Sequence, residues 1–381
     1  MMNKRKFDTV IIGAGPAGLM AARELAENDV NYLIIEAKGK IGSPLRCGEI
    51  TREDTFSELF HHTDYPFIKN KISKISFQIK DTQKLFQKNL FMLDKQEFLQ
   101  WLAEPIKDNL MLNTKLLDMK DKADFLELVT SNGTFETQLA ILANGTNYAI
   151  PKKLGLINGE VGLVPCIGGL FENTTLDRDT AYFYYDEDMY IASWVFPKYN
   201  NIFNAGAGTI LNNKITAGLN LAKAFKESMH KLEIMLDGEP GFGGRYVTDG
   251  PIRRTYCDRL LVCGDCAGHV FAGMGEGIYY ALKAGQLAGQ TTIKAAKNDT
   301  FKREFLKEYE INWKKSFGRQ MQAGIVFTTI LFFLMRHHLA YRTLKVIKPK
   351  EILDIWFNGK VSFRLKIFYY LLRLTGCSTR R

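Results

Sequence analysis

The sequence predicts an α/β fold with a second, antiparallel sheet and a helical C-terminal region, and three observations carry this prediction. Residues 9–26 run from an apolar strand through a glycine turn into an alanine-rich helix. Residues 71–91 alternate apolar and polar side chains with the period of a half-buried strand. From Phe301 onward, apolar residues recur every four positions, which is typical of one face of a helix. With 381 residues, the chain is long enough for two domains.

The N-terminal unit has the pattern of a Rossmann-like dinucleotide site. Apolar residues 9–12 run into Gly-x-Gly-x-x-Gly, and after a helix a second apolar strand, residues 32–35, ends in an acid. The first glycine allows a tight turn, the second lets backbone approach a pyrophosphate, and the third lets helix and strand pack closely. The helix N-terminus favours phosphate, and the acid suits a ribose diol. A glycine-rich turn of some other α/β domain is the alternative. The predicted cofactor residues here are Gly13, Gly15, Pro16, Ala17, Gly18, Glu36 and Ala37.

Later segments return to the same pattern of strand and glycine turn. A strand at 139–142 leads into a small-residue turn that suits the closing of the nucleotide-binding domain. A strand at 260–263 leads into Gly-Asp, and a glycine-flanked helix follows, whose start again faces a ligand. The residues that we expect at these turns are Ala143, Gly145, Gly264, Asp265, Gly275, Glu276, Gly277 and Ile278.

The remaining segments predict a second domain and a C-terminal region. Residues 182–196 are rich in aromatic side chains, which suit either a wall for a bulky apolar ligand or an ordinary core face. The apolar run 325–335 is too short to cross a bilayer, and we expect no spanning segment. We predict a discontinuous nucleotide-binding domain (1–70, 92–150 and 251–300), a substrate domain (71–91 and 151–250) and a helical, basic region (301–381).

Charge and cysteines narrow the possible partners and location. The net charge of +10 comes from the last 81 residues, which hold 17 Lys and Arg against 5 Asp and Glu. A basic, apolar tail favours an anionic membrane surface rather than nucleic acid, although packing over the substrate domain or dimerisation is an equal alternative. Six irregularly spaced cysteines indicate reduced thiols in the cytoplasm. With the basic tail, they predict a cytoplasmic protein whose alternative location is peripheral, on the inner face of the cell membrane. Cys263 and Cys266 lack a second ligand pair, so we predict no metal site.

These motifs together resemble the geranylgeranyl reductase family, within the flavoprotein group that contains p-hydroxybenzoate hydroxylase. Residues 13–36 resemble its FAD fingerprint, 44–48 its cysteine-bearing loop near the flavin, and 264–278 its flavin-binding turn. Residues 93–98 resemble its second FAD-contacting helix, with Lys95 where arginine is usual. The resemblance extends from residue 9 to about residue 320 and implies a p-hydroxybenzoate hydroxylase-type fold. The FAD contacts that it adds are Arg46, Cys47, Gly48 and Lys95.

The most distinctive match is Trp-Val-Phe-Pro-Lys at 194–198, which resembles the family's Tyr-x-Trp-x-Phe-Pro box in the substrate cavity. Ala192 takes the place of the tyrosine, and Tyr190 is the nearest one. The resemblance implies that Trp194, Phe196 and Pro197 hold a polyprenyl chain at the flavin, with Tyr190 beside it.

The resemblance also implies an activity: hydrogen is added across isolated carbon–carbon double bonds of a polyprenyl chain on a lipid, quinone or diphosphate. Cys47 is the first candidate for the proton donor or for tuning the flavin, or it is only a small residue that fits the loop. Tyr190 is the weaker donor candidate. NADPH and ferredoxin both stay open as electron donor, as does the oligomeric state. The rival functions are a flavin-dependent monooxygenase or halogenase, and a non-catalytic flavin-binding protein that docks on membranes.

Overall fold

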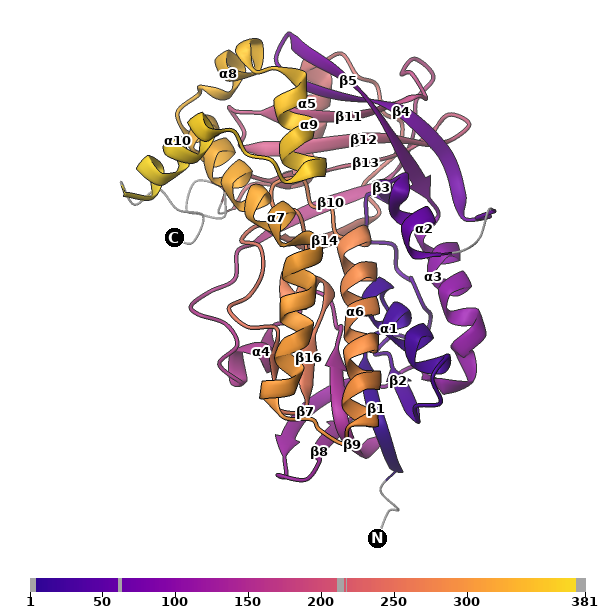
Figure 1. Ribbon diagram of the computed structural model, residues 1–381. Helices are drawn as coiled ribbons and strands as arrows, with labels where there is room; N and C mark the ends of the chain where they lie inside the picture. Colours follow the sequence, from indigo (N-terminus) through magenta and orange to yellow (C-terminus); the bar gives the residue numbers. More distant parts are fainter. Residues whose placement is uncertain (1–4, 61–63, 211–215, 217, 375–381) are drawn as a thin grey trace.

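The computed structural model describes residues 5–60, 64–210, 216 and 218–374. Within these residues the strands form two eight-stranded sheets, which we call sheet A and sheet B. Figure 1 shows sheet A in the lower half of the molecule, sheet B in the upper half, and helices α6 and α7 running alongside them.

Sheet A is a parallel sheet with an antiparallel extension. Its central strand β1 pairs in parallel with both β2 and β9, so that Val10 lies between Leu33 and Ala140. β7 and β8 extend β9 as antiparallel strands. The predicted order of strand, glycine turn, helix and strand is therefore confirmed. Sheet A comprises β15 (Tyr256–Cys257), β16 (Leu260–Val262), β9 (Gly133–Leu142), β1 (Arg5–Ile12), β2 (Tyr32–Ile35), β6 (Leu110–Met111), β7 (Leu116–Asp121) and β8 (Leu126–Thr130).

Helices cover sheet A closely because glycines let them approach. A Cβ on Gly285 of α6 would lie 2.1 Å from the carbonyl oxygen of Ala17 in α1, so only glycine fits between these helices. Asp94 caps α3 as predicted, because its carboxylate accepts from the Glu97 amide at 3.0 Å. The helices of this half are α1 (Pro16–Ala26), α2 (Asp54–Leu59), α3 (Lys95–Ala103), η1 (Glu104–Asn109), α4 (Ala149–Lys153), η2 (Gly264–Ala267) and α6 (Ile278–Lys297).

Sheet B is curled and antiparallel, except that β11 and β4 pair in parallel. Its edge strand β3 comes from the segment that we assigned to the nucleotide-binding domain, and β4 and β5 reach beyond the predicted range 71–91. The substrate half therefore begins earlier in the chain than the sequence pattern indicated. Sheet B runs in the order β14 (Phe242–Val247), β10 (Leu163–Glu172), β13 (Ile202–Thr209), β12 (Ile191–Tyr199), β11 (Thr180–Asp186), β4 (Ile68–Ile79), β5 (Thr82–Leu93) and β3 (Ile50–Arg52).

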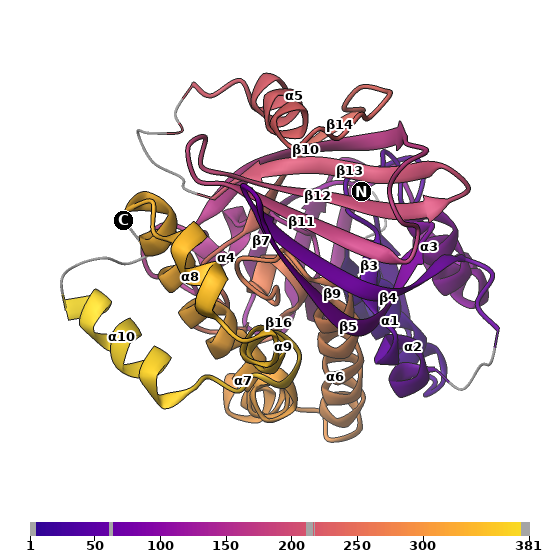
Figure 2. The ribbon, with the colours of Figure 1, turned by 90° about the horizontal axis from the view of Figure 1, so that it is seen from above.

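The aromatic residues of β11 divide between the two faces of sheet B. Tyr182 and Tyr184 pack in the cluster that includes α5 (Leu221–Lys231). Phe183 and Tyr185 point to the opposite face and join the main core. Figure 2 shows α5 on one side of the sheet and helices α8 and α9 on the other. Alternate residues of the aromatic run therefore pack in two cores, as expected for a core face, while the expectation of a wall for a ligand stays a prediction.

The C-terminal region is helical, as predicted, and part of it is core. Tyr309, Trp313, Phe317 and Met321 of α7 are at most 2% exposed, so the predicted apolar stripe packs inside the protein. Gly359 ends α9 in the left-handed region, at φ +62°. The helices are α7 (Arg303–Arg336), α8 (Ala340–Val346), α9 (Pro349–Asn358) and α10 (Phe363–Leu374).

One helix among the described residues, α7, is long and apolar enough to cross a membrane by length and composition. Length and composition alone do not overturn the expectation of no spanning segment, because a core helix meets the same criteria. The apolar run 325–335 lies within this continuous 34-residue helix, whose N-terminal half has the burial of a core helix.

Candidate functional site

The glycines of the turn after β1 differ in whether the surrounding protein leaves room for a side chain. Gly13 has φ +107°, and a Cβ there would lie 2.4 Å from the carbonyl oxygen of Ala143. A Cβ on Gly18 would lie 1.9 Å from the carbonyl oxygen of Gly13. At Gly15, by contrast, a Cβ would meet no atom within 4 Å. Gly15 therefore faces open space at the N-terminus of α1, where a pyrophosphate approaches backbone in such folds.

Glu36 is fixed beside this turn. Its Oε2 accepts from the Ala14 amide at 2.8 Å, and its Oε1 accepts from the Lys38 amide at 3.0 Å. The carboxylate thus lies at the carboxyl end of β2, next to the glycine turn and to the exposed Ala37, as a ribose-binding acid should.

Lys38 lies near two other cations, Arg46 and Lys95, and near the Glu36 carboxylate. Desolvation lowers the pKa of Lys38, the positive charges of Arg46 and Lys95 act in the same direction, and the Glu36 carboxylate opposes them. Positive charge at a helix N-terminus favours a bound pyrophosphate. Arg46 and Lys95 were predicted here. Lys38 was missed, and its only signal in the sequence was its position two residues after the acid.

The second glycine turn lies at the carboxyl ends of β9 and β16. Gly145 and Gly264 adopt φ +67° and +72°, which favour glycine. Asp265 follows at once, and its Oδ1 is 3.4 Å from the position of a Cβ on Gly277, the residue before α6. Burial raises the pKa of the Asp265 carboxyl, and the Lys95 ammonium opposes this shift. The structure therefore brings the N-termini of α1 and α6 to one edge of sheet A, as predicted. Gly275, with φ +69°, and Ile278, the first residue of α6, belong to the same turn.

The loop that carries Cys47 is held by a buried polar network. The Glu49 carboxylate accepts from Lys198 Nζ at 2.7 Å and from Asn204 Nδ2 at 3.0 Å, both at Oε2. Its Oε1 accepts from the backbone amide of Lys95 at 2.9 Å. Glu49, Lys198 and Asn204 are 1%, 3% and 0% exposed. In the sequence, Lys198 was only the last residue of the motif 194–198, and no role was predicted for Glu49 or Asn204.

Trp194 and Phe196 face this loop from β12. A Cβ on Gly48 would lie 3.2 Å from Phe196 Cε2 and 3.7 Å from Trp194 Nε1. The Trp194 ring lies flat across sheet B because Gly168 and Gly206 lack side chains; a Cβ at either would come within 2.8 Å of Trp194 Cζ2. The two aromatic residues predicted to bind substrate and the cysteine loop are therefore in direct contact. Pro197 continues the same strand and is buried.

The side chains of two predicted site residues, Tyr190 and Glu276, do not lie at the cysteine loop or in the glycine turn. Tyr190, at φ +56°, sits at the turn before β12, and its hydroxyl is 3.5 Å from His338 Nε2. Because Trp194 is four residues further along an extended strand, Tyr190 is roughly 13 Å from the point where β12 meets the cysteine loop. The Glu276 side chain accepts from Trp356 Nε1 of α9 at 2.7 Å, so it joins α9. Only the backbone of Glu276 belongs to the glycine turn.

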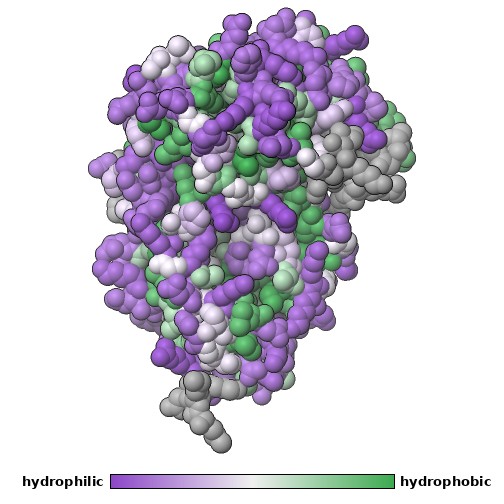
Figure 3. Space-filling view, turned by 180° about the vertical axis from the view of Figure 1, so that it is seen from behind, coloured by the Kyte–Doolittle hydropathy of each residue, from purple (hydrophilic) through white to green (hydrophobic). Residues whose placement is uncertain are grey.

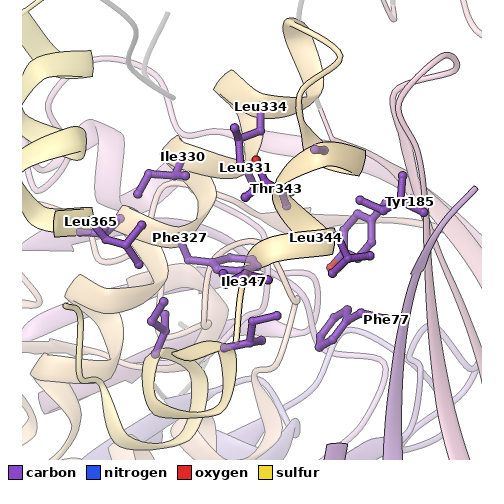
Figure 4. A pocket seen from close by; sticks show the side chains of 15 residues that line it. Phe77, Tyr185, Phe327, Ile330, Leu331, Leu334, Thr343, Leu344, Ile347 and Leu365 are labelled. Atoms are coloured by element: carbon purple, nitrogen blue, oxygen red, sulfur yellow. The ribbon is translucent and has the colours of Figure 1, made fainter. Parts of the chain in front are cut away.

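An apolar cavity of about 100 Å³ lies between sheet B and the C-terminal helices. Figure 4 shows Phe77 and Tyr185 pointing from the strands toward side chains of α7, α8 and α10. The Tyr185 hydroxyl reaches Met274 Sδ at 3.4 Å, in the loop before Gly275. The cavity is therefore separated from the second glycine turn by a single layer of side chains. Its lining includes Phe77, Tyr185, Phe327, Ile330, Leu344 and Leu365.

The residues at the first glycine turn suit the pyrophosphate and the ribose of FAD. Gly15 has open space at the N-terminus of α1, Glu36 is held by two backbone amides, and Lys38 lies near Arg46 and Lys95. Among the described residues there is no group of three or more His, Cys, Asp or Glu side chains that suits a metal ion.

Comparisons with known proteins identify relatives of this chain. A family model described as pyridine nucleotide-disulphide oxidoreductase matches residues 10–164. Digeranylgeranylglycerophospholipid reductase 1 of Methanosphaera stadtmanae is 30% identical over 329 residues, covering 80% of this chain and 79% of that protein. The digeranylgeranylglycerophospholipid reductase of Methanococcus vannielii is 28% identical over 387 residues, covering 95% of each chain.

Solved structures share the fold at lower identity. A geranylgeranyl bacteriochlorophyll reductase-like protein from Thermoplasma acidophilum superposes with a TM-score of 0.75 at 19% identity, covering 98% of both chains. The flavin-dependent brominase Bmp2 reaches a TM-score of 0.73 at 12% identity, covering 97% of this chain and 99% of the other. Both likenesses concern the fold alone.

Fold and site together define an FAD-dependent oxidoreductase with the architecture of p-hydroxybenzoate hydroxylase. Within that class, the chain belongs to the geranylgeranyl reductase family.

Proposed function

We propose that this protein saturates isolated carbon–carbon double bonds of a polyprenyl chain carried by a membrane lipid. The observation that carries the proposal is the contact of Trp194 and Phe196 with the Cys47 loop. The contact supports the proposal because a flat apolar surface then lies against the loop that carries the thiol. Relatives named as reductases of a digeranylgeranyl lipid support the choice of substrate class.

An isolated double bond has no polar group to activate it, so its reduction depends on position and on exclusion of water. When FAD is bound and reduced, it supplies a hydride to one carbon of the bond. The Trp194 and Phe196 rings hold the chain flat and keep water out. The other carbon then needs one proton, and the net change is the addition of two hydrogens to the bond.

Cys47 Sγ is our choice for the proton donor. It accepts from the Glu49 amide at 3.3 Å, and the Lys95 ammonium lies beside it as a charge partner. Desolvation lowers the pKa of Lys95, but the charges of Cys47, Asp265 and Glu49 outweigh it, so the pKa is raised overall. A cation that stays protonated stabilises the thiolate left by proton transfer, and water then restores the thiol. Tyr190 remains the second candidate, although its hydroxyl faces His338.

The apolar cavity suits part of the prenyl chain. Its walls are almost entirely aliphatic and aromatic, and it lies one side chain away from the flavin-binding turn. Its lining side chains come from sheet B and from the C-terminal helices, including α7, α8 and α10.

The decisive experiment is anaerobic turnover of the purified holoenzyme with chemically reduced flavin and a panel of prenyl lipids, quinones and prenyl diphosphates. We expect a mass gain of two hydrogens for each reduced bond. Repeating the assay with NADPH and with reduced ferredoxin identifies the electron donor. Oxygen uptake that depends on a substrate, with no mass gain under anaerobic conditions, would instead support a monooxygenase or halogenase. Flavin that no substrate reoxidises would support a binding protein.

We also propose that α10 docks the enzyme on the cytoplasmic face of an anionic membrane. Its inner side packs on α7 through Leu365, Phe368 and Leu372, while Phe363 and Leu374 on its outer side are 77% and 83% exposed. Figure 1 shows α10 at the margin of the molecule. The face opposite to that view is mainly hydrophilic, with apolar side chains in small patches (Figure 3). Basic residues accompany the exposed apolar ones, as in helices that lie on anionic lipid. They are Arg364, Lys366 and Arg373.

Sedimentation with vesicles tests the docking proposal. We expect binding to vesicles that contain anionic lipid, weaker binding to neutral ones, and loss of binding in a Phe363→Ser/Leu374→Ser variant. Met235→Ser is the matched control, because Met235 is 76% exposed but lies next to α5, on the outer side of sheet B. Equal binding of all three proteins would exclude α10 as the docking surface, and a shift to a dimer in the wild type alone would assign it to self-association.

A further inference from the structure

A single buried amide connects the Trp194 ring to the cysteine loop. Asn204 Oδ1 accepts from Trp194 Nε1 at 2.9 Å, while Asn204 Nδ2 donates to the Cys47 carbonyl oxygen at 2.9 Å and to Glu49 Oε2 at 3.0 Å. The indole nitrogen only donates and a carbonyl oxygen only accepts, so the orientation of the amide is unique. Asn204 is 0% exposed. Both hydrogens of its side-chain Nδ2 and one of the two lone pairs of its Oδ1 form hydrogen bonds inside the protein.

We infer that Asn204 is a positioning residue that sets the distance between the Trp194 ring and Cys47, and thereby selects where the reacting double bond lies. This inference rests on the proposed function and adds to it a residue that touches neither substrate nor reacting atoms. The amide binds both the Trp194 side chain and the cysteine loop: its oxygen accepts from the indole, and its nitrogen donates to the backbone carbonyl of Cys47.

The surrounding charges keep this amide in place. Asn204 lies opposite Phe196 in the pairing of β12 with β13, so its side chain emerges on the face that carries the two substrate aromatics. The Glu49 carboxylate on its other side is locked by Lys198 and by the Lys95 amide. Glu49 itself adopts φ +62°, a conformation that a residue with a side chain holds only when its neighbours enforce it. The cysteine loop is thus held by sheet B rather than by its own sequence.

Geometry of this kind acts mainly on the chemical step. A displacement of about 1 Å between reacting groups lowers a rate by about 100-fold, while apolar binding of a long chain changes little. Loss of the two hydrogen bonds from Asn204 Nδ2, at roughly 1 kcal/mol each, increases the open population of the loop by about tenfold to thirtyfold.

The test compares Asn204→Asp with Trp194→Phe. Asn204→Asp keeps the acceptor for the indole but loses the donor to Cys47 and places negative charge beside Glu49, so it separates the loop from the sheet. Trp194→Phe leaves the bond to Cys47 intact. Asn204→Ser, which introduces no charge, replaces Asn204→Asp if that variant does not retain FAD. The matched control is Asn173→Asp, at a buried asparagine directly after β10 whose Nδ2 donates to the Met235 carbonyl at 2.6 Å.

Two readouts keep this inference separate from the proposed function. The first is the rate at which Cys47 is alkylated, followed by peptide mapping; we expect it to rise about tenfold in Asn204→Asp and to be unchanged in Trp194→Phe and Asn173→Asp. The second is prenyl reduction, for which we expect kcat to fall about 10- to 100-fold in both site variants with KM within about threefold. An alkylation rate in Asn204→Asp equal to that of the wild type or of the control overturns the inference, even if the protein reduces no prenyl lipid.

Discussion

The ammonium group of Lys198 lies 2.7 Å from the Glu49 carboxylate, and the two side chains are only 3% and 1% exposed. Lys198 comes from the end of β12, and Glu49 directly precedes β3 at the edge of sheet B, so this ion pair holds the cysteine loop against sheet B. Asp94, the cap of α3, adds a second carboxylate at 3.4 Å from the same ammonium.

The buried pair predicts an asymmetry between single and double substitutions. Lys198→Met leaves the Glu49 carboxylate buried without its cation, and we expect a loss of about 3–5 kcal/mol in the free energy of unfolding. Lys198→Met with Glu49→Gln removes both charges and should recover most of that loss. Urea unfolding of the three proteins measures the difference, and a double variant no more stable than the single one would contradict the prediction.

The glycine turn predicts that fold and cofactor binding separate at two neighbouring glycines. Gly15→Ala meets no protein atom within 4 Å, so the variant should fold with an unchanged thermal midpoint while its FAD affinity falls by about tenfold or more. Gly18→Ala places a Cβ 1.9 Å from the Gly13 carbonyl oxygen and should fold poorly. Thermal melts of the apoprotein and flavin titration measure the two effects. If Gly15→Ala binds FAD like the wild type, this glycine does not face the cofactor.

The flat position of the Trp194 ring predicts an effect of a methyl group on β10, two strands away in sheet B. In Gly168→Ala the new Cβ would lie 2.6 Å from Phe242 Cζ and 2.8 Å from Trp194 Cζ2, so both rings must shift, and we expect kcat to fall about tenfold or more with FAD content unchanged. Gly243→Ala on the neighbouring β14 is the control, because its Cβ would come no closer than 3.9 Å to any atom. Equal turnover of the two variants would show that the ring position does not matter.

The thiol of Cys47 predicts a loss of turnover without a loss of cofactor. A serine hydroxyl is a much weaker acid than a thiol, so Cys47→Ser should bind FAD normally and reduce prenyl substrate at least about tenfold more slowly. Cys257→Ser is the control. Cys257 lies in β15, an edge strand of sheet A that is separated by β16, β9 and β1 from β2, the strand before the cysteine loop. Full turnover of Cys47→Ser would remove the thiol from the mechanism.

Glu276 predicts a pH dependence of stability. Burial raises the pKa of its carboxyl to about 7, although the Arg52 charge and the bond from Trp356 oppose this shift. Below about pH 4.5 the carboxyl is protonated in both states; as pH rises toward 7 the unfolded chain releases its proton first, so this group lowers the stability of the fold. Glu276→Gln should therefore match the wild type near pH 4.5 and exceed it at pH 8, by on the order of 2–3 kcal/mol. Urea unfolding at the two pH values checks the sign, and an equal effect at both would contradict it.

The sequence alone determined the nucleotide-binding half of this protein and its class. Strand, glycine turn, helix and acid are neighbours in the chain, and local sterics require glycine at Gly13 and Gly18, so the order of these elements could be predicted. The strand alternation of residues 71–91 and the buried stripe of α7 were equally local signals.

The tertiary structure alone decided how the cysteine loop is held. Cys47 and Asn204 are 157 residues apart, and their hydrogen bond depends on the pairing of β12 with β13 and on the docking of sheet B against sheet A. No periodicity or spacing in the sequence predicts such a contact. A polar side chain needs a partner within the protein only when distant segments of the chain have folded over it and excluded water. For the same reason Glu49 and Asn204 looked like ordinary polar residues, while Tyr190, near the motif in sequence, lies at the other end of the strand, next to His338.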